Sequence, residues 1–211
     1  MNAVVTDLYL SFPCREKVFS HVLLERLQPL LQMTQRPQQS GFTAGRSTID
    51  ALLVLQLLSE LRRQLKRPLY VVFVNIIPAF HSVDRNALWK ALRARGIPDI
   101  LLNLIEDLHT HTGATVGIGN KFCHRFSTTS GVRPGCVLAP TLFLVAIDWI
   151  LGHLTPEVDI TVGHYHFPDL AYADDAAILM SDHLQADSVL QSFNAFAAPL
   201  GLKLSWPKTK L

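Results

Sequence analysis

The sequence has few cysteines, and none of them is arranged as a pair. Only three occur in 211 residues, Cys14, Cys123 and Cys136, and no CxxC spacing links any two of them. The pattern therefore gives no indication of a zinc site or a redox centre. An odd number of scattered cysteines fits a reducing, intracellular compartment, with nucleus and cytoplasm both left open.

Charge and long apolar runs are also scarce. Charged residues make up 17% of the chain, and the net charge of +2 is too small to indicate nucleic-acid binding by itself. No apolar run approaches the length of a membrane span, and the first twelve residues lack the pattern of a signal peptide. We expect neither secretion nor membrane insertion, and the oligomeric state is left open.

What the sequence does have is apolar periodicity, with 49% hydrophobic residues, enough for a sizeable core. Helix signals and strand signals are mixed along the chain, which predicts an α+β fold. The expected helices are 47–67, 84–95, 99–111, 141–154 and 184–198. The expected strands are 69–77, 114–118 and 121–127 joined through Gly119-Asn120, 170–173 and 176–180, and 202–206.

One polar residue interrupts the strand expected at 69–77. This segment is rich in β-branched and aromatic residues, and such a run is typical of a strand buried on both faces. Asn75 is its only amide. The sequence offers no packing reason for an amide at this position.

Two adjacent carboxylates, Asp174 and Asp175, lie between two short apolar stretches. The pattern predicts a strand, an acidic turn and a second strand. Adjacent like charges repel, and a divalent cation would relieve that cost, although many such pairs are simply hydrated. The apolar flanks favour a metal site here.

Four motifs then occur in order. They are Gln-Ser-Gly-Phe-Thr-Ala-Gly-Arg-Ser-Thr at 39–48, Ser-Gly-Val-Arg-Pro-Gly-Cys-Val-Leu-Ala-Pro at 130–140, Tyr-Ala-Asp-Asp at 172–175 and Gly-Leu-Lys-Leu-Ser-Trp-Pro-Lys-Thr-Lys at 201–210. Together they resemble the reverse transcriptases of non-LTR (LINE-type) retrotransposons, from about Pro13 onward. A Tyr-Ala-Asp-Asp motif alone would be weak, but the ordered set is specific.

The resemblance implies a right-hand polymerase, with fingers and an antiparallel palm sheet packed on helices. Residues 1–68 would belong to the fingers and 69–211 to the palm with the remaining fingers elements, the thumb being absent. The implied activity is RNA-directed DNA polymerisation by two-metal nucleotidyl transfer. Its implied partners are an RNA template, a DNA primer and dNTPs, with Mg²⁺ as cofactor and Mn²⁺ as an alternative.

The resemblance also assigns roles to single residues. Asp174 and Asp175 match the metal-binding carboxylates, and Phe80 matches the aromatic gate that excludes a ribose 2′-hydroxyl. Arg46 and Lys208 match positions near the nucleotide, while Gly131, Arg133, Pro134 and Gly135 match a loop beside template and nucleotide. Each has a plainer alternative: Phe80 as a core ring, Arg46 as a turn residue and Lys208 as part of a solvated tail.

Asn75 stands where the family has its first catalytic aspartate. An amide offers one neutral oxygen instead of an ionised carboxylate, so metal binding would be weakened. Losing one such electrostatic contact typically costs roughly 3 to 4 kcal/mol of transition-state stabilisation. Pro134 also replaces a usual glutamine. These departures predict a truncated copy whose catalysis is lost or severely impaired.

A second hypothesis is a non-catalytic nucleic-acid-binding protein or scaffold, a relic of a retrotransposon. It rests on a basic surface that several helices would supply, alongside the alternative that these residues merely solvate the helices. The residues concerned are Arg62, Arg63, Lys66, Arg67, Arg85, Arg93 and Arg95.

Overall fold

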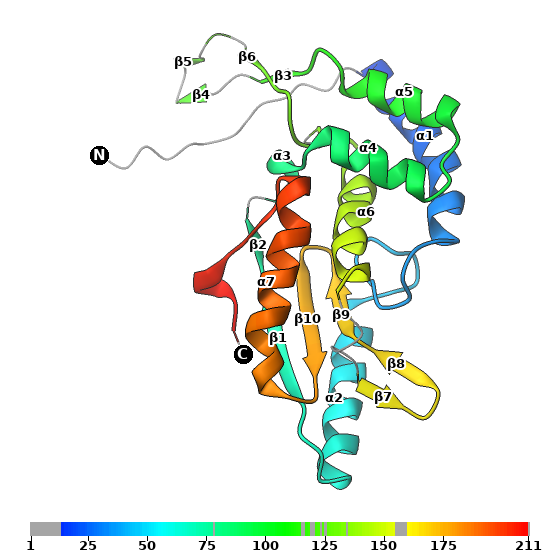
Figure 1. Cartoon of the computed structure of the whole chain (residues 1–211). Helices are drawn as coiled ribbons and strands as arrows, with labels where there is room; N and C mark the ends of the chain where they lie inside the picture. The colour runs from blue at the N-terminus through cyan, green and yellow to red at the C-terminus, as the bar shows by residue number, and fades with distance from the viewer. Residues whose placement is uncertain are drawn as a thin grey trace.

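The computed structural model describes residues 14–77, 79–114, 117–118, 121–122, 124, 126–133, 135–154 and 160–210 (Figure 1). Helices and antiparallel strands are mixed along the chain, and this confirms the predicted α+β class. Pro134, Cys123 and the Gly119-Asn120 turn lie outside the described residues. None of the described helices is both long and apolar enough to cross a bilayer.

A three-stranded antiparallel sheet lies at the centre (Figure 1). Its order is β1 (Tyr70–Val74), β10 (Asp175–Met180) and β9 (Asp169–Tyr172). β9 and β10 form the predicted hairpin around the acidic turn. Val74 pairs with Ala176, so the residue after β1 arrives beside the residue that opens β10. Sheet order therefore brings Asn75 next to Asp175.

Helices cover one face of this sheet, and the main core fills the space between them. Residues Val72, Val74 and Ile178 point into that core with helix residues Phe143 and Phe193. The helices that contribute residues to this core match the predicted ones within a few residues: α4 (Arg85–Ala94), α5 (Asp99–His109), α6 (Ala139–Gly152) and α7 (Ala186–Ala197). Asp84 caps α4 by accepting from the Ala87 N–H over 2.8 Å.

The opposite face of the sheet is only partly covered. Helix α2 (Thr48–Gln64) packs against β9, and its residue Leu58 forms a second apolar cluster with Leu179 and Ile160. Beyond that cluster Phe73 remains 49% exposed. The prediction that 69–77 is buried on both faces is therefore wrong, because α2 covers only part of the second face.

The strand expected at 69–77 also breaks at Asn75. After β1 the chain leaves the central sheet, and β2 (Ile76–Ile77) pairs instead with β11 (Lys203–Leu204). Asn75 thus occupies the junction between two sheets. Its backbone C=O accepts from the Ser205 N–H over 2.8 Å, so the junction is held by a hydrogen bond.

The remaining elements are short or were not expected. The region predicted as strands 114–118 and 121–127 forms two small ladders, β3 (Gly113–Ala114) with β6 (Phe126–Ser127) and β4 (Gly117–Ile118) with β5 (Lys121–Phe122). Others are α1 (Cys14–Gln32), α3 (Ala79–Ser82), β7 (Ile160–Val162) and β8 (Tyr165–Phe167). The described residues also form the 3₁₀ turns η1 (His183–Gln185), η2 (Ala198–Leu200) and η3 (Trp206–Lys208).

Candidate active site

Asn75 and Asp175 form the centre of the candidate site. The Asn75 Nδ2 lies 3.4 Å from Asp175 Oδ1, and the amide donates to the carboxylate. Asp175 is exposed and Asp174 is half-buried. The structure therefore brings the degenerate position 75 into direct contact with one of the two adjacent carboxylates, across two strands that are 100 positions apart in sequence.

The turn that carries the carboxylates has an unusual backbone. Ala173 has φ +55°, a left-handed conformation that non-glycine residues seldom adopt. Its N–H donates to the side-chain Oε1 of Gln39 over 3.1 Å. Backbone bonds join Ser40 and Gln38 to the same residue, Ala171. The segment before α2 thus runs along the free edge of β9.

A buried charge cluster lies beside this edge. Arg36 pairs with Asp169 at 2.5 Å and lies 3.9 Å from Asp148, which Arg95 approaches to 3.5 Å. Both carboxylates are almost fully buried. Desolvation raises the pKa of Asp148 and of Asp169, and the neighbouring arginines oppose that shift. Asp148 interrupts the otherwise apolar helix α6 and is part of this cluster.

A cavity of about 780 Å³ opens over the partly covered face of the sheet. Three of the predicted site residues line it: Asn75, Asp175 and Lys208. Lys210 joins them, and apolar residues form much of the remaining wall, among them Leu52, Leu55, Phe73, Leu170 and Tyr172. The polar part of the cavity wall thus consists of the Asp175 carboxylate, the Asn75 amide and the two lysines of the C-terminal segment.

Phe80 does not line that cavity. Its half-buried ring packs on Phe143 with the ring centroids 4.7 Å apart, and its backbone C=O accepts from the Val132 N–H over 2.9 Å. The contact with Phe143 fits the core-ring alternative, while the gate role stays a prediction. Arg46 is exposed and is likewise absent from the lining, so its nucleotide role also stays a prediction.

The loop around Gly131 packs directly against the segment that carries Phe80. Gly131 has φ +79°, and a Cβ there would lie 2.6 Å from the His81 carbonyl oxygen. Its N–H donates to the Val83 C=O over 2.8 Å. Only glycine adopts this positive φ readily and has no Cβ to collide with the His81 carbonyl. Gly135 is exposed, also with positive φ, and its template role is untested.

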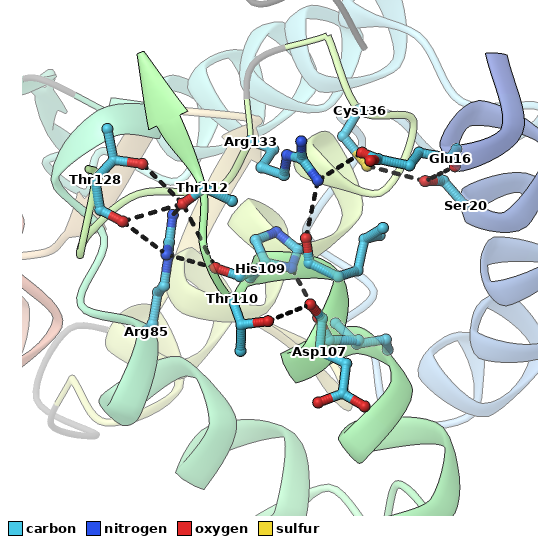
Figure 2. Close-up of polar contacts among 12 residues, drawn as sticks. Glu16, Ser20, Arg85, Asp107, His109, Thr110, Thr112, Thr128, Arg133 and Cys136 are labelled. Atoms are coloured by element: carbon cyan, nitrogen blue, oxygen red, sulfur yellow. Dashed lines mark hydrogen bonds and ion pairs between the residues drawn. The ribbon is translucent and has the colours of Figure 1, made fainter. Parts of the chain in front are cut away.

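Two arginines attach this loop to the helices, as Figure 2 shows in part. Arg85 donates to the carbonyls of Gly131, His109, Thr128 and Ser130 and to the hydroxyl of Thr112, over 2.7 to 3.2 Å. Arg133 points away from solvent, donating to the Leu108 C=O over 3.0 Å and pairing with Glu16 at 2.8 Å. Arg133 thus forms contacts within the fold. The role of Arg85 could not be predicted, because its acceptors are backbone carbonyls that residue type does not identify.

His109 is buried between these arginines (Figure 2). Its Nδ1 bonds the Ile105 C=O over 2.8 Å, and its ring meets Trp89 edge-on. Burial, opposed by the hydrogen bond to Ile105 and assisted by the positive charges of Arg85 and Arg133, lowers the pKa of His109 to about 4. The imidazole is therefore neutral at physiological pH.

The expected basic surface is present only in part: Lys66 and Arg67 are exposed, while the other five arginines pair within the fold. Arg62 is buried and donates to the Pro68 C=O, Arg85 is engaged as described, and Arg95 pairs with Asp148. Arg63 and Arg93 pair with Glu60 and Glu106 on the helix surface. These arginines are used within the fold rather than presented to a partner.

The donor set fits a divalent cation only in part. Asp174 and Asp175 carry carboxylate oxygens, the kind of ligand that Mg²⁺ prefers. At position 75 the group facing Asp175 is an NH₂, which cannot ligate a cation. No cluster of three or more His, Cys, Asp or Glu side chains occurs within the part of the chain that the structure describes.

The fold and this site define a polymerase palm, and solved structures share the arrangement. Telomerase from Candida tropicalis, in a complex with a fragment of telomeric RNA, superposes with a TM-score of 0.65 at 11% identity, over 93% of this chain and 34% of that one. Telomerase from Candida albicans gives a TM-score of 0.57 at 12% identity. At these identities the likeness concerns the fold alone.

The family model for reverse transcriptase (RNA-dependent DNA polymerase) matches residues 10–211, and the chain belongs to that family. Its relatives include the Pol polyprotein of an R2 element of Popillia japonica, 26% identical over 92% of this chain, and that of R2DM from Drosophila melanogaster, 24% identical over 82%. The predicted non-LTR retrotransposon relationship is confirmed. The chain spans 27% and 16% of those two proteins.

Proposed function

We propose that this chain is an RNA-directed DNA polymerase domain whose chemistry is severely weakened by Asn75. Its substrates would be an RNA template, a DNA primer and dNTPs. The observation that carries the proposal is the contact between Asn75 and Asp175, because it places position 75 where a third carboxylate would complete a metal site.

Bound Mg²⁺ would supply Lewis-acid activation of the primer 3′-hydroxyl and neutralise charge on the phosphates. Asp174 and Asp175 would hold it. The amide of Asn75 lowers the negative charge of the site by one relative to an aspartate, so the affinity for the cation would fall. Lys208 and Lys210, on the same cavity, would attract phosphate oxygens.

The test is primer extension on an RNA template with Mg²⁺, using the chain as it is, its Asn75→Asp variant, and a control with Asp174→Ala and Asp175→Ala. We expect extension from Asn75→Asp that exceeds the unchanged chain by at least about 100-fold, in line with one lost electrostatic contact. Equal rates for the unchanged chain and Asn75→Asp would refute the assignment of Asn75.

A second candidate is template-primer binding without polymerisation. The observation in its favour is that the two lysines remain on the cavity while position 75 has lost its carboxylate. Binding of an RNA–DNA duplex should then weaken steeply with salt and should fall when both Lys208 and Lys210 become glutamine. Duplex affinity that is unchanged by those substitutions would remove this candidate.

A further inference from the structure

We infer that Gln39 is a positioning residue for the Asp174-Asp175 pair, setting the shape of the turn from which both carboxylates project. Gln39 lies before α2, and 134 positions of sequence separate it from that turn. The inference rests on the proposed function, because it concerns the metal-binding geometry of that same site.

One oxygen of Gln39 ties two backbone segments together. Its Oε1 accepts from the Ala173 N–H over 3.1 Å and from the Gly41 N–H over 2.8 Å. Gln39 is only 2% exposed, so water does not compete for these N–H groups. The residue just before Asp174 therefore has its amide direction determined by a side chain from outside the hairpin.

The turn needs such a partner because of its backbone conformation. Ala173 has φ +55° and carries a Cβ, so the local chain does not favour this state by itself. Its buried N–H also requires an acceptor. Gln39 satisfies the N–H in this conformation and so selects it over ordinary turns, which would aim Asp174 differently.

The position of the Gln39 oxygen is itself well determined. The backbone on either side of Gln39 bonds to Ala171, with Ser40 N–H donating over 2.8 Å and the Gln38 C=O accepting over 3.1 Å. Gly41 then passes so close that a Cβ on it would lie 2.3 Å from the Ala173 nitrogen. The glycine of the Gln-Ser-Gly-Phe motif is thus required by contact with the acidic turn.

Packing alone does not account for a glutamine at position 39. Its Nε2 is buried and has no hydrogen-bond partner among the described residues. An unsatisfied buried N–H is unfavourable, so an apolar residue would suit the space better. The use that remains for the side chain is its acceptor oxygen.

The experiment uses the Asn75→Asp chain as parent and compares Gln39→Met, Gln39→Glu and the neighbouring control Gln38→Met. Amide hydrogen exchange is followed in peptides spanning Ala173, and Mn²⁺ binding is followed by electron paramagnetic resonance. We expect Gln39→Met to speed exchange at the turn at least tenfold and to weaken Mn²⁺ binding at least fivefold. Gln39→Glu keeps an acceptor oxygen and should restore slow exchange, and Gln38→Met should match the parent.

The outcomes separate this inference from the proposed function. The proposed metal site fails if the parent binds no Mn²⁺, or if its Mn²⁺ binding survives the combined Asp174→Ala and Asp175→Ala substitutions. Exchange at Ala173 then still decides the role of Gln39. If Gln39→Met matches Gln38→Met in both exchange and Mn²⁺ binding, the inference is overturned. Faster exchange across the whole chain, rather than at the turn, would also overturn it.

Discussion

Asn75, directly after β1, and Asp175, at the start of β10, share a hydrogen bond of 3.4 Å, from amide Nδ2 to carboxylate Oδ1. The pair joins the point where the central sheet ends to the point where the acidic turn begins. An aspartate at position 75 would place a third carboxylate at the same spot. The contact therefore links the stability of this region to the charge that the site can hold.

Asn75→Asp should make stability depend on Mg²⁺. Without a divalent cation, replacing the amide by a like charge beside Asp175 should cost about 0.5 to 1 kcal/mol. Millimolar Mg²⁺ should recover that loss, because it binds the folded site and not the unfolded chain. Thermal melts with and without Mg²⁺ check this. An equal Mg²⁺ response in the unchanged chain would contradict it.

Arg85→Lys should destabilise the loop around Gly131. A lysine keeps the charge but cannot reach the four carbonyls and one hydroxyl that the planar guanidinium contacts. We expect a loss of about 2 to 3 kcal/mol in urea unfolding. Arg93→Lys on the same helix, where the arginine pairs with Glu106 at the surface, is the control and should change stability by under about 0.5 kcal/mol.

His109 should contribute to acid sensitivity. Its pKa is about 4 in the folded chain and 6.5 in the unfolded chain. The neutral imidazole therefore contributes fully to stability above pH 6.5, and this contribution is lost as pH falls through 4. The difference in unfolding free energy between the unchanged chain and His109→Gln, taken at each pH, separates the titration of His109 from that of the carboxylates. That difference should shrink by on the order of 3 kcal/mol between pH 7 and pH 4. A difference that stays constant would exclude a neutral buried imidazole.

Asp148 and Asp169 should act in the opposite direction. Burial raises the pKa of both groups, so the stability they contribute is complete below their unfolded pKa and is lost as pH rises through the folded one. This is a reason to measure His109 by difference rather than from the unchanged chain alone.

Removing Arg36 should leave buried charge without compensation. Arg36→Met strands Asp169, and breaking a buried pair from one side typically costs about 3 to 5 kcal/mol. Adding Asp169→Asn should recover part of that loss, so a double-mutant cycle should give a coupling well above about 1 kcal/mol. Arg63→Met, from an exposed pair with Glu60, supplies the control. Additive losses at Arg36 and Asp169 would contradict direct coupling.

The sequence by itself determined the family, most of the larger elements and the acidic turn. Apolar periodicity and stop signals located α2, α4, α5, α6 and α7, because a helix that buries one face has apolar residues at regular spacing. The ordered motifs identified the reverse transcriptase, and Asn75 stood out as the only amide in an apolar strand. These features are local or depend on residue type, so a linear reading can find them.

Only the tertiary structure decided which distant residues meet. Sheet order placed Asn75 against Asp175, and incomplete cover by α2 left Phe73 exposed where a fully buried strand was expected. Gln39 and Arg85 acquired their roles through backbone N–H and C=O groups far away in sequence. Every residue carries a backbone C=O, and every residue except proline an N–H, so residue type does not identify the partners, and their positions follow only from the packed fold.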